Sequence, residues 1–218
     1  MADFLVPHRH LPWRGLDVEA PVGLATGTKI SLIALAPSRV CLNKLDQARR
    51  LDYAQAAPKK GAQACGWNIA ANMTGASGSK FRPHTVTAQC SIVLASYIWL
   101  REVDRHAQTY LGSGLKKTHH AGTYSCRRQR GNGSGAWSEH AFANAWDVTG
   151  FELADGRVIS IFKHWRSDGS KTGKARRKFL RKTRASACQL FNVVLTPDYN
   201  TAHKDHFHLD QGPSSSCH

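Results

Sequence analysis

Residues 88–110 read AQCSIVLASYIWLREVDRHAQTY, the stretch with the clearest secondary-structure pattern in the chain. Apolar and small residues recur in it at intervals of three and four, which places them near one face of a helix. These residues are Ile92, Val93, Ala95, Ser96, Trp99, Leu100 and Val103. The pattern predicts a helix from Ala88 to about Tyr110, and we expect its burial to organise the hydrophobic core.

The segments before this helix are predicted to be less regular. The first forty residues are rich in Pro and Gly, so residues 1–37 are expected to form an extended arm with little structure of its own. The arm would lie on a single domain spanning residues 38–218. Helical spacing of apolar residues behind Ser38, a candidate N-cap, predicts a short helix from Ser38 to about Ala54. Turn residues throughout residues 56–84 leave room for at most a short strand.

The second half of the chain alternates strand and helix patterns. HAGTYSCR at residues 120–127 is typical of a strand, and residues 147–162 predict a hairpin that turns at residues 154–157. A basic helix is predicted from about Thr172 to Leu190. The strand patterns FNVVLTP and DHFHLD follow it. Together these elements predict an α+β fold with a central, mainly antiparallel sheet and helices on one side.

The composition is strongly basic. The 218 residues include 30 Lys and Arg against 15 Asp and Glu, a formal net charge of +15, which favours polyanions such as nucleic acid, cell-wall polymers or anionic membrane surfaces. Much of the charge lies in the run KTGKARRKFLRKTR at residues 171–184. Because Phe179, Leu180 and Thr183 would point inward, we interpret this run as the solvated face of a helix. The chain lacks the aromatic platforms or recognition-helix signature of a specific nucleic-acid binder.

Six cysteines are spread over the chain without a Cys-x-x-Cys pair, which favours disulfides over a cysteine-ligated zinc finger; they are Cys41, Cys65, Cys90, Cys126, Cys188 and Cys217. The alternative is six buried small side chains in a reducing compartment. No stretch approaches the roughly 20 apolar residues of a membrane span. Residues 1–3 lack the features of a signal peptide, so export would require a signal already removed or another route.

Two separated clusters contain residue types that bind metals. His140 and Asp147 lie seven residues apart in SEHAFANAWDV, and His206 and His208 lie two apart in HKDHFHLD. A catalytic zinc ion takes three protein ligands from His, Asp or Glu and leaves one position for water. If the two segments form neighbouring strands, they supply such a set.

Strand parity divides the second cluster between two faces. His206, His208 and Asp210 share one face, while Phe207 and Leu209 share the other and are expected to face the core. One histidine would then serve as a ligand and the other as a proton-transfer or supporting group.

Three segments, TYSCR, SEHAFANAWDVTGFELADGRVIS and ACQLFNVVLTPDYNTAHKDHFHLD, closely resemble the extensin-like C-terminal domain family. This family is a bacterial relative of the LAS zinc metallopeptidases, which include D-Ala-D-Ala peptidases and murein endopeptidases on the fold of the Hedgehog signalling domain. The resemblance covers roughly residues 25–217 and is specific from Tyr124 onward. It implies that His140, Asp147 and His208 bind Zn²⁺.

The same resemblance implies roles for residues around the metal. His203 is similar to a further histidine of the murein endopeptidases, and Asp205 stands where the dipeptidase branch has a catalytic Glu. The general base is therefore either Asp205 or His206, with His206 and His203 placed first. Arg127 is similar to an arginine that faces the substrate. Family placement further suggests Cys41–Cys65 and Cys90–Cys217 disulfides, and a Cys126–Cys188 bond would brace the site.

These inferences predict a periplasmic or secreted zinc peptidase that acts on peptidoglycan, with D-Ala to diaminopimelate cross-links as its substrate. A D,D-carboxypeptidase is one alternative. A binding module that keeps the metal and has lost catalysis is another, and the position of His206 and Asp205 relative to the metal would distinguish it. The sequence does not indicate an oligomeric state.

Overall fold

The computed structural model describes residues 6–83, 85–129 and 134–218. Its α-helices are α1 (Thr26–Leu35), α2 (Ser38–Asp46), α3 (Cys90–Leu111), α4 (Ile161–His164) and α5 (Lys171–Ala187). Three 3-10 helices are η2 (His8–His10), η3 (Glu139–Phe142) and η4 (Thr201–His203). The strands are β1 (Leu51–Ala56), β2 (Lys59–Lys60), β3 (Gly66–Trp67), β4 (Ala70–Ala76), β5 (Ser79–Arg82), β6 (Val86–Ala88), β7 (Leu115–Gly122), β8 (Ala145–Leu153), β9 (Val158–Ser160), β10 (Val193–Leu195), β11 (Phe207–Asp210) and β12 (Ser216–Cys217).

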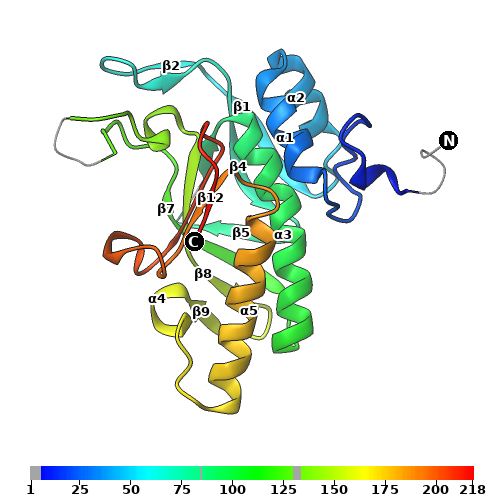
Figure 1. Ribbon diagram of the computed structural model, residues 1–218, viewed down its shortest axis with the longest axis vertical. Coiled ribbons are helices and arrows are strands. Elements are labelled where there is room, and N and C mark those ends of the chain that lie inside the picture. The colour runs from blue at the N-terminus through cyan, green and yellow to red at the C-terminus, as the bar shows by residue number, and fades with distance from the viewer. Residues whose placement is uncertain (1–5, 84, 130–133) are drawn as a thin grey trace.

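Ten of the strands form one sheet, whose main path runs β1-β4-β5-β7-β8-β11-β10-β12, with β6 on β4 and β9 on β8. The pairs β5–β7 and β10–β12 are parallel and the other pairs of this sheet are antiparallel. In Figure 1, α1, α2, α3 and α5 lie together on one side of the sheet. The predicted α+β class, with a mainly antiparallel sheet, is confirmed.

Helix α3 forms the centre of the core, as its apolar periodicity predicts. Gly112 ends it at φ 70°, a left-handed conformation that glycine adopts without strain. Trp99 has no exposed surface, and its ring centroid lies 6.0–6.2 Å from those of Trp146, Phe151 and Phe191. Each large apolar side chain removed from water in this way contributes roughly 1.5–3 kcal/mol. The core therefore joins α3 to the strand β8 that carries Trp146.

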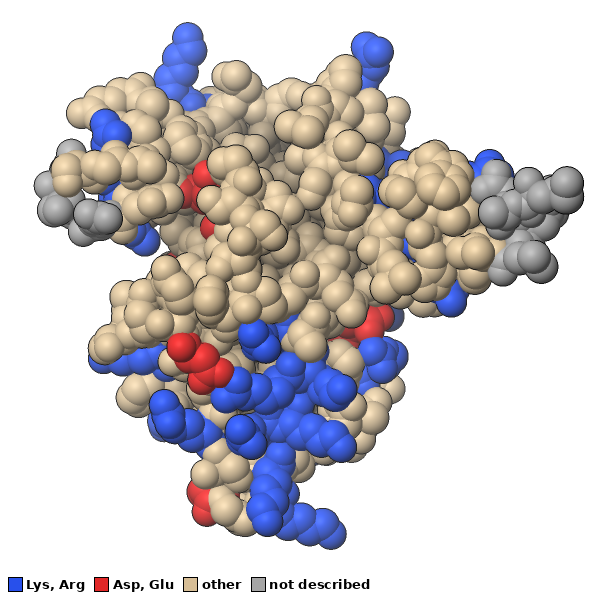
Figure 2. Space-filling view, viewed as in Figure 1, with Lys and Arg blue, Asp and Glu red and all other residues tan. Residues whose placement is uncertain are grey.

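Helix α5 packs its apolar side toward α3 and turns its basic side to solvent. The indole nitrogen of Trp99 donates a hydrogen bond to the carbonyl oxygen of Thr183 at 3.0 Å, which ties the two helices together. Figure 2 shows a dense group of Lys and Arg side chains over the region of α5. The prediction of a basic helix is confirmed, with Lys171–Ala187 as its bounds.

Four expectations for local structure are wrong. The arm expected over residues 1–37 contains the helix α1, because Ile30 and Ile33 are buried in the core. The helix expected to reach Ala54 ends at Asp46, and the chain continues into β1, which pairs with β4.

Residues 56–84 contain β4 and β5, because pairing with β1 and β7 stabilises strands whose sequences give only a weak signal. The strand expected at residues 120–127 ends at Gly122, after which the chain leaves the sheet. The hairpin expected at residues 154–157 is present, with Gly156 at φ 87°.

The three disulfides are Cys41–Cys90, Cys65–Cys126 and Cys188–Cys217. The Cys41–Cys65 and Cys90–Cys217 pairings expected from family placement and the Cys126–Cys188 bond expected to brace the site are therefore wrong, because each cysteine bonds to the one that packing brings beside it. Helix α2 packs on the first turn of α3, and the end of α5 lies beside β12.

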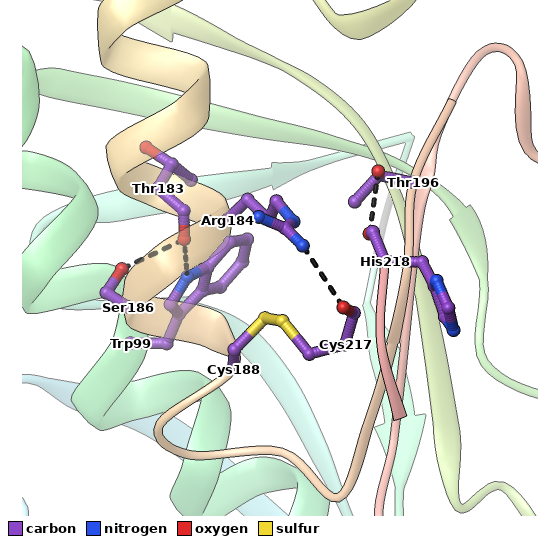
Figure 3. The surroundings of a disulfide bond; sticks show 8 residues. All are labelled: Trp99, Thr183, Arg184, Ser186, Cys188, Thr196, Cys217 and His218. Atoms are coloured by element: carbon purple, nitrogen blue, oxygen red, sulfur yellow. Dashed lines mark hydrogen bonds between the residues drawn. A yellow bond between two sulfur atoms is a disulfide. The ribbon is translucent and has the colours of Figure 1, made fainter. Parts of the chain in front are cut away.

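Figure 3 shows the Cys188–Cys217 bond with hydrogen bonds around it. Two of these hold the C-terminal strand: the Arg184 guanidinium donates to the Cys217 carbonyl oxygen at 3.1 Å, and the Thr196 hydroxyl donates to the His218 carbonyl oxygen at 2.7 Å. Three disulfides are typical of proteins in an oxidising space. Within the described ranges, no helix has the length and apolar character needed to cross a membrane.

Candidate metal centre

Strands β8 and β11 bring two of the predicted ligands together. They are antiparallel neighbours, and Asp147 lies directly opposite His208. Trp146, Phe207 and Leu209 are fully buried in the core. Because successive strand residues point to opposite faces, Asp147 and His208 project from the face of the sheet that is turned away from α3. The parity predicted for Phe207 and Leu209 is confirmed.

The third predicted ligand, His140, lies on the short helix η3 beside this face. The Ser138 hydroxyl caps η3 by accepting the backbone N–H of His140, and Ala143 ends it in a left-handed conformation at φ 53°. His140 is 3% exposed, and its Nδ1 lies 3.1 Å from the carbonyl oxygen of Thr123. As the donor in that bond, Nδ1 leaves Nε2 free to face Asp147 and His208.

The three side chains converge on one point. His140 Nε2 lies 3.1 Å from one Asp147 carboxylate oxygen, and His208 Nδ1 lies 3.0 Å from the other. The two ring nitrogens are 3.2 Å apart. Within the described part of the chain, this is the group of His, Cys, Asp and Glu side chains whose donor atoms are close enough to hold a metal ion, all within 4.8 Å of one another. Two imidazole nitrogens and a carboxylate form a donor set that suits zinc.

A second layer of contacts orients the histidines among the candidate ligands. His208 Nε2 lies 2.8 Å from a carboxylate oxygen of Asp210, which is 5% exposed and also accepts the backbone N–H of Gly212 at 2.8 Å. Together with the Thr123 carbonyl oxygen on His140, this gives both histidines an acceptor on the nitrogen that faces away from the centre. Such acceptors orient metal-binding histidines and raise their basicity.

Asn144 supports the loop that carries His140. Its side-chain amide donates to the Glu139 carboxylate at 2.7 Å. Burial raises the pKa of Glu139, although this hydrogen bond opposes the shift. A carboxyl group with a raised pKa therefore lies beside His140 on η3.

The charges at the centre are strongly coupled. Burial opposes ionisation of Asp147, but hydrogen bonds from His140 and His208 outweigh it and lower the pKa of Asp147. Burial likewise opposes the charge of His208, but hydrogen bonds to Asp147 and Asp210 outweigh it and raise its pKa to about 9. The centre therefore holds a positive charge between two carboxylates in the absence of metal, and a bound cation would replace the proton.

The remaining predicted site residues lie around this centre. His206 Nε2 is 3.7 Å from an Asp147 oxygen, and His206 Nδ1 is 2.8 Å from Asp205 Oδ1. The ring of His203 lies 5.2 Å from that of His206, and His203 Nδ1 donates to the amide oxygen Oδ1 of Asn200 at 2.8 Å. Asp205 is exposed and makes its contact through His206.

Positive charge surrounds His203. Burial, followed by the charges of His206 and His208 and by a smaller contribution from Arg127, lowers the pKa of His203 to about 4. Arg127 is itself exposed, and its charge is close enough to act on His203. The structure thus brings His203, Asp205 and His206 together with the three candidate ligands and places Arg127 at their periphery.

Two features of the site were not foreseen. The carboxylate of Asp210 contacts His208, although the sequence showed only that the two share a face. A groove of about 370 Å³ lies between Thr149 on β8 and Asp205, the residue that contacts His206, and its walls include Val158 and Phe162. These two apolar side chains are 50% and 61% exposed. The sequence did not predict this groove, because two apolar residues near a hairpin, Val158 and Phe162, do not by themselves indicate one.

Comparison with known proteins identifies one match. The sequence model of the family described as extensin-like protein C-terminus matches residues 39–218. No curated protein and no solved structure matches the chain. Since the matched region covers most of the 218 residues, the chain belongs to the extensin-like C-terminus family.

Proposed function

We propose that this protein is a zinc-dependent peptidoglycan hydrolase that cleaves the amide bond between D-Ala and diaminopimelate in cross-linked stem peptides. The observation that carries the proposal is the convergence of His140 Nε2, Asp147 and His208 Nδ1 at the face of the sheet turned away from α3, with a further histidine, His206, beside them. Resemblance to the LAS metallopeptidases supplies the substrate class.

A zinc ion in this donor set would supply Lewis acidity toward the scissile carbonyl and lower the pKa of a coordinated water. The residues of the chain would provide the rest. His206 Nε2, which lies 3.7 Å from an Asp147 oxygen, would take up a proton and return it to the leaving amine.

Asp205 accepts at His206 Nδ1 at 2.8 Å, which fixes the orientation of the imidazole and favours His206 as the general base with Asp205 as its positioning residue. Arg127 would place positive charge near the developing oxyanion. His203, held neutral near physiological pH, would contact the substrate side of the centre.

The adjoining groove supports a polymeric rather than a very small substrate. Residues of β8 and β9 line it together with Asp205, and it offers exposed apolar surface at Val158 and Phe162 together with the charged Lys204. A stem peptide combines short aliphatic side chains with carboxylates, and both find a partner there. The oxidising compartment that the three disulfides suggest would be the periplasm or the exterior, where this substrate is found.

Digestion of purified peptidoglycan followed by mass analysis of the fragments tests the proposal. Zinc-loaded protein is expected to remove cross-linked dimers, while His208→Ala and chelator-treated protein leave them intact. The exposed His8, which lies outside the site, provides a matched control as His8→Ala. Release of terminal D-Ala alone would show a carboxypeptidase. Binding of peptidoglycan by metal-loaded protein without any product would show a binding module and refute the proposed hydrolysis.

A further inference from the structure

Helix α5 carries a strongly basic face outside the candidate metal centre. Eight of the seventeen residues of Lys171–Ala187 are Lys or Arg and none is acidic. The apolar side of the helix, which includes Phe179 and Leu180, is buried. The basic face comprises Lys171, Lys174, Arg177, Lys178 and Lys182, all of them exposed. Figure 2 shows a continuous patch of Lys and Arg side chains over the region of α5.

Most of this charge is not neutralised by the protein. Arg181 pairs with Asp198 and lies over the ring of Trp165, and Lys178 lies over the ring of Tyr110. Lys171, Lys174, Arg177 and Lys182 form no ion pair with any residue that the structure describes. Like charges three and four residues apart on a helix repel one another, so the arrangement costs stability unless an anion covers it.

The geometry of the face indicates a polymer as the anion. Lys171 and Lys182 are eleven residues apart, or about 16 Å along the helix at about 1.5 Å per residue. A small anion contacts one or two of these side chains, whereas a chain with repeating negative charges contacts several at once and releases counterions from each.

Two further observations limit the class of anionic partner. The exposed positions of α5 carry no large apolar side chain that would anchor the helix in a lipid bilayer. The three disulfides suggest an oxidising space, where nucleic acid is not a usual partner. The helix also packs on the side of the sheet opposite the metal centre, so a bound polymer would leave that centre open.

We propose that the basic face of α5 binds an anionic glycopolymer of the cell envelope through repeated phosphodiester groups. This docking is separate from the proposed hydrolysis and does not depend on it. It would hold the protein on the envelope while the metal centre, on the other face of the sheet, remains accessible.

Binding of poly(glycerol phosphate) to the full chain with its disulfides intact tests the inference. The test variant combines Lys171→Gln, Lys174→Gln, Arg177→Gln and Lys182→Gln, which keeps helix propensity because Gln, Lys and Arg are similar helix formers. The matched control combines Arg39→Gln, Arg49→Gln, Lys60→Gln and Lys116→Gln, four exposed cations elsewhere on the surface. Both variants lose the same net charge.

The test variant is expected to bind at least about tenfold more weakly at low salt, with the slope of log K against log salt reduced by about 3, while the control stays near the wild type. Equal losses in the two variants would show that net charge alone drives binding and would overturn the assignment. Tighter binding of single-stranded DNA, or of vesicles of anionic lipid, than of poly(glycerol phosphate) would assign the face to another partner and equally overturn it.

Discussion

Replacing Asp210 by Asn is expected to weaken zinc binding without disturbing the fold. Asp210 lies 2.8 Å from His208 Nε2 and is 5% exposed, so its contact with the imidazole is a buried, charge-assisted hydrogen bond. Asn keeps an acceptor of nearly the same shape but removes the negative charge. His208 Nδ1 then becomes a weaker donor to the metal.

The expected size follows from the role of such partners. Loss of a carboxylate behind a metal-binding histidine costs about 10- to 100-fold in metal affinity, or about 1.4–2.7 kcal/mol. Titration against a chromophoric zinc chelator measures the affinity, and circular dichroism checks the fold. Asp205→Asn is the matched control, because Asp205 is exposed and contacts His206 rather than a predicted ligand. Unchanged zinc affinity in Asp210→Asn would refute the role assigned to Asp210.

Three further predictions concern stability and substrate binding. In metal-free protein the pKa of His208 is raised from 6.5 to about 9. The protonated imidazole therefore stabilises the fold by about 3 kcal/mol below pH 6.5, and this contribution is lost as pH rises through 9. Denaturant titration from pH 6 to 10 should show the loss of stability, and bound zinc should abolish this pH dependence. Replacing Cys188 and Cys217 together by Ser removes a disulfide with a sequence separation of 29 residues. This should lower the free energy of unfolding, measured without reductant, by roughly 3–4 kcal/mol. A loss below about 1 kcal/mol would contradict this prediction. Phe162→Ser should raise the KM for cross-linked peptide several-fold with little change in kcat, because Phe162 lines the groove, which none of the candidate ligands does. A fall in kcat alone would show that the substrate does not bind in this groove.

The parts of the fold that the sequence predicts are those with strong local periodicity. Helix α3 carries enough apolar residues at helical spacing to be recognised, and the alternation around Phe207 and Leu209 identifies the buried face of β11. The predicted ligands come from two segments that the fold makes into neighbours. Their register, with Asp147 opposite His208, depends on strand pairing and is not visible in either segment alone.

The elements that the sequence did not predict depend on tertiary contacts. Strand β4, AANMTGA, has small residues of low strand propensity, and it forms because Ala71 and Met73 are buried in the core. Helix α1 is stabilised by burial of Ile30 against the same core. Disulfide pairing depends on distances in space, which cysteine spacing does not encode.

The proposed hydrolysis is tested most directly by incubating a purified D-Ala to diaminopimelate cross-linked dimer with zinc-loaded protein in ¹⁸O-labelled water. We predict two monomers, with the label in the newly formed D-Ala carboxylate of one of them, and no products when His206 is replaced by Ala in protein that still binds zinc. An intact dimer after incubation with correctly folded, zinc-loaded wild type would contradict the proposal.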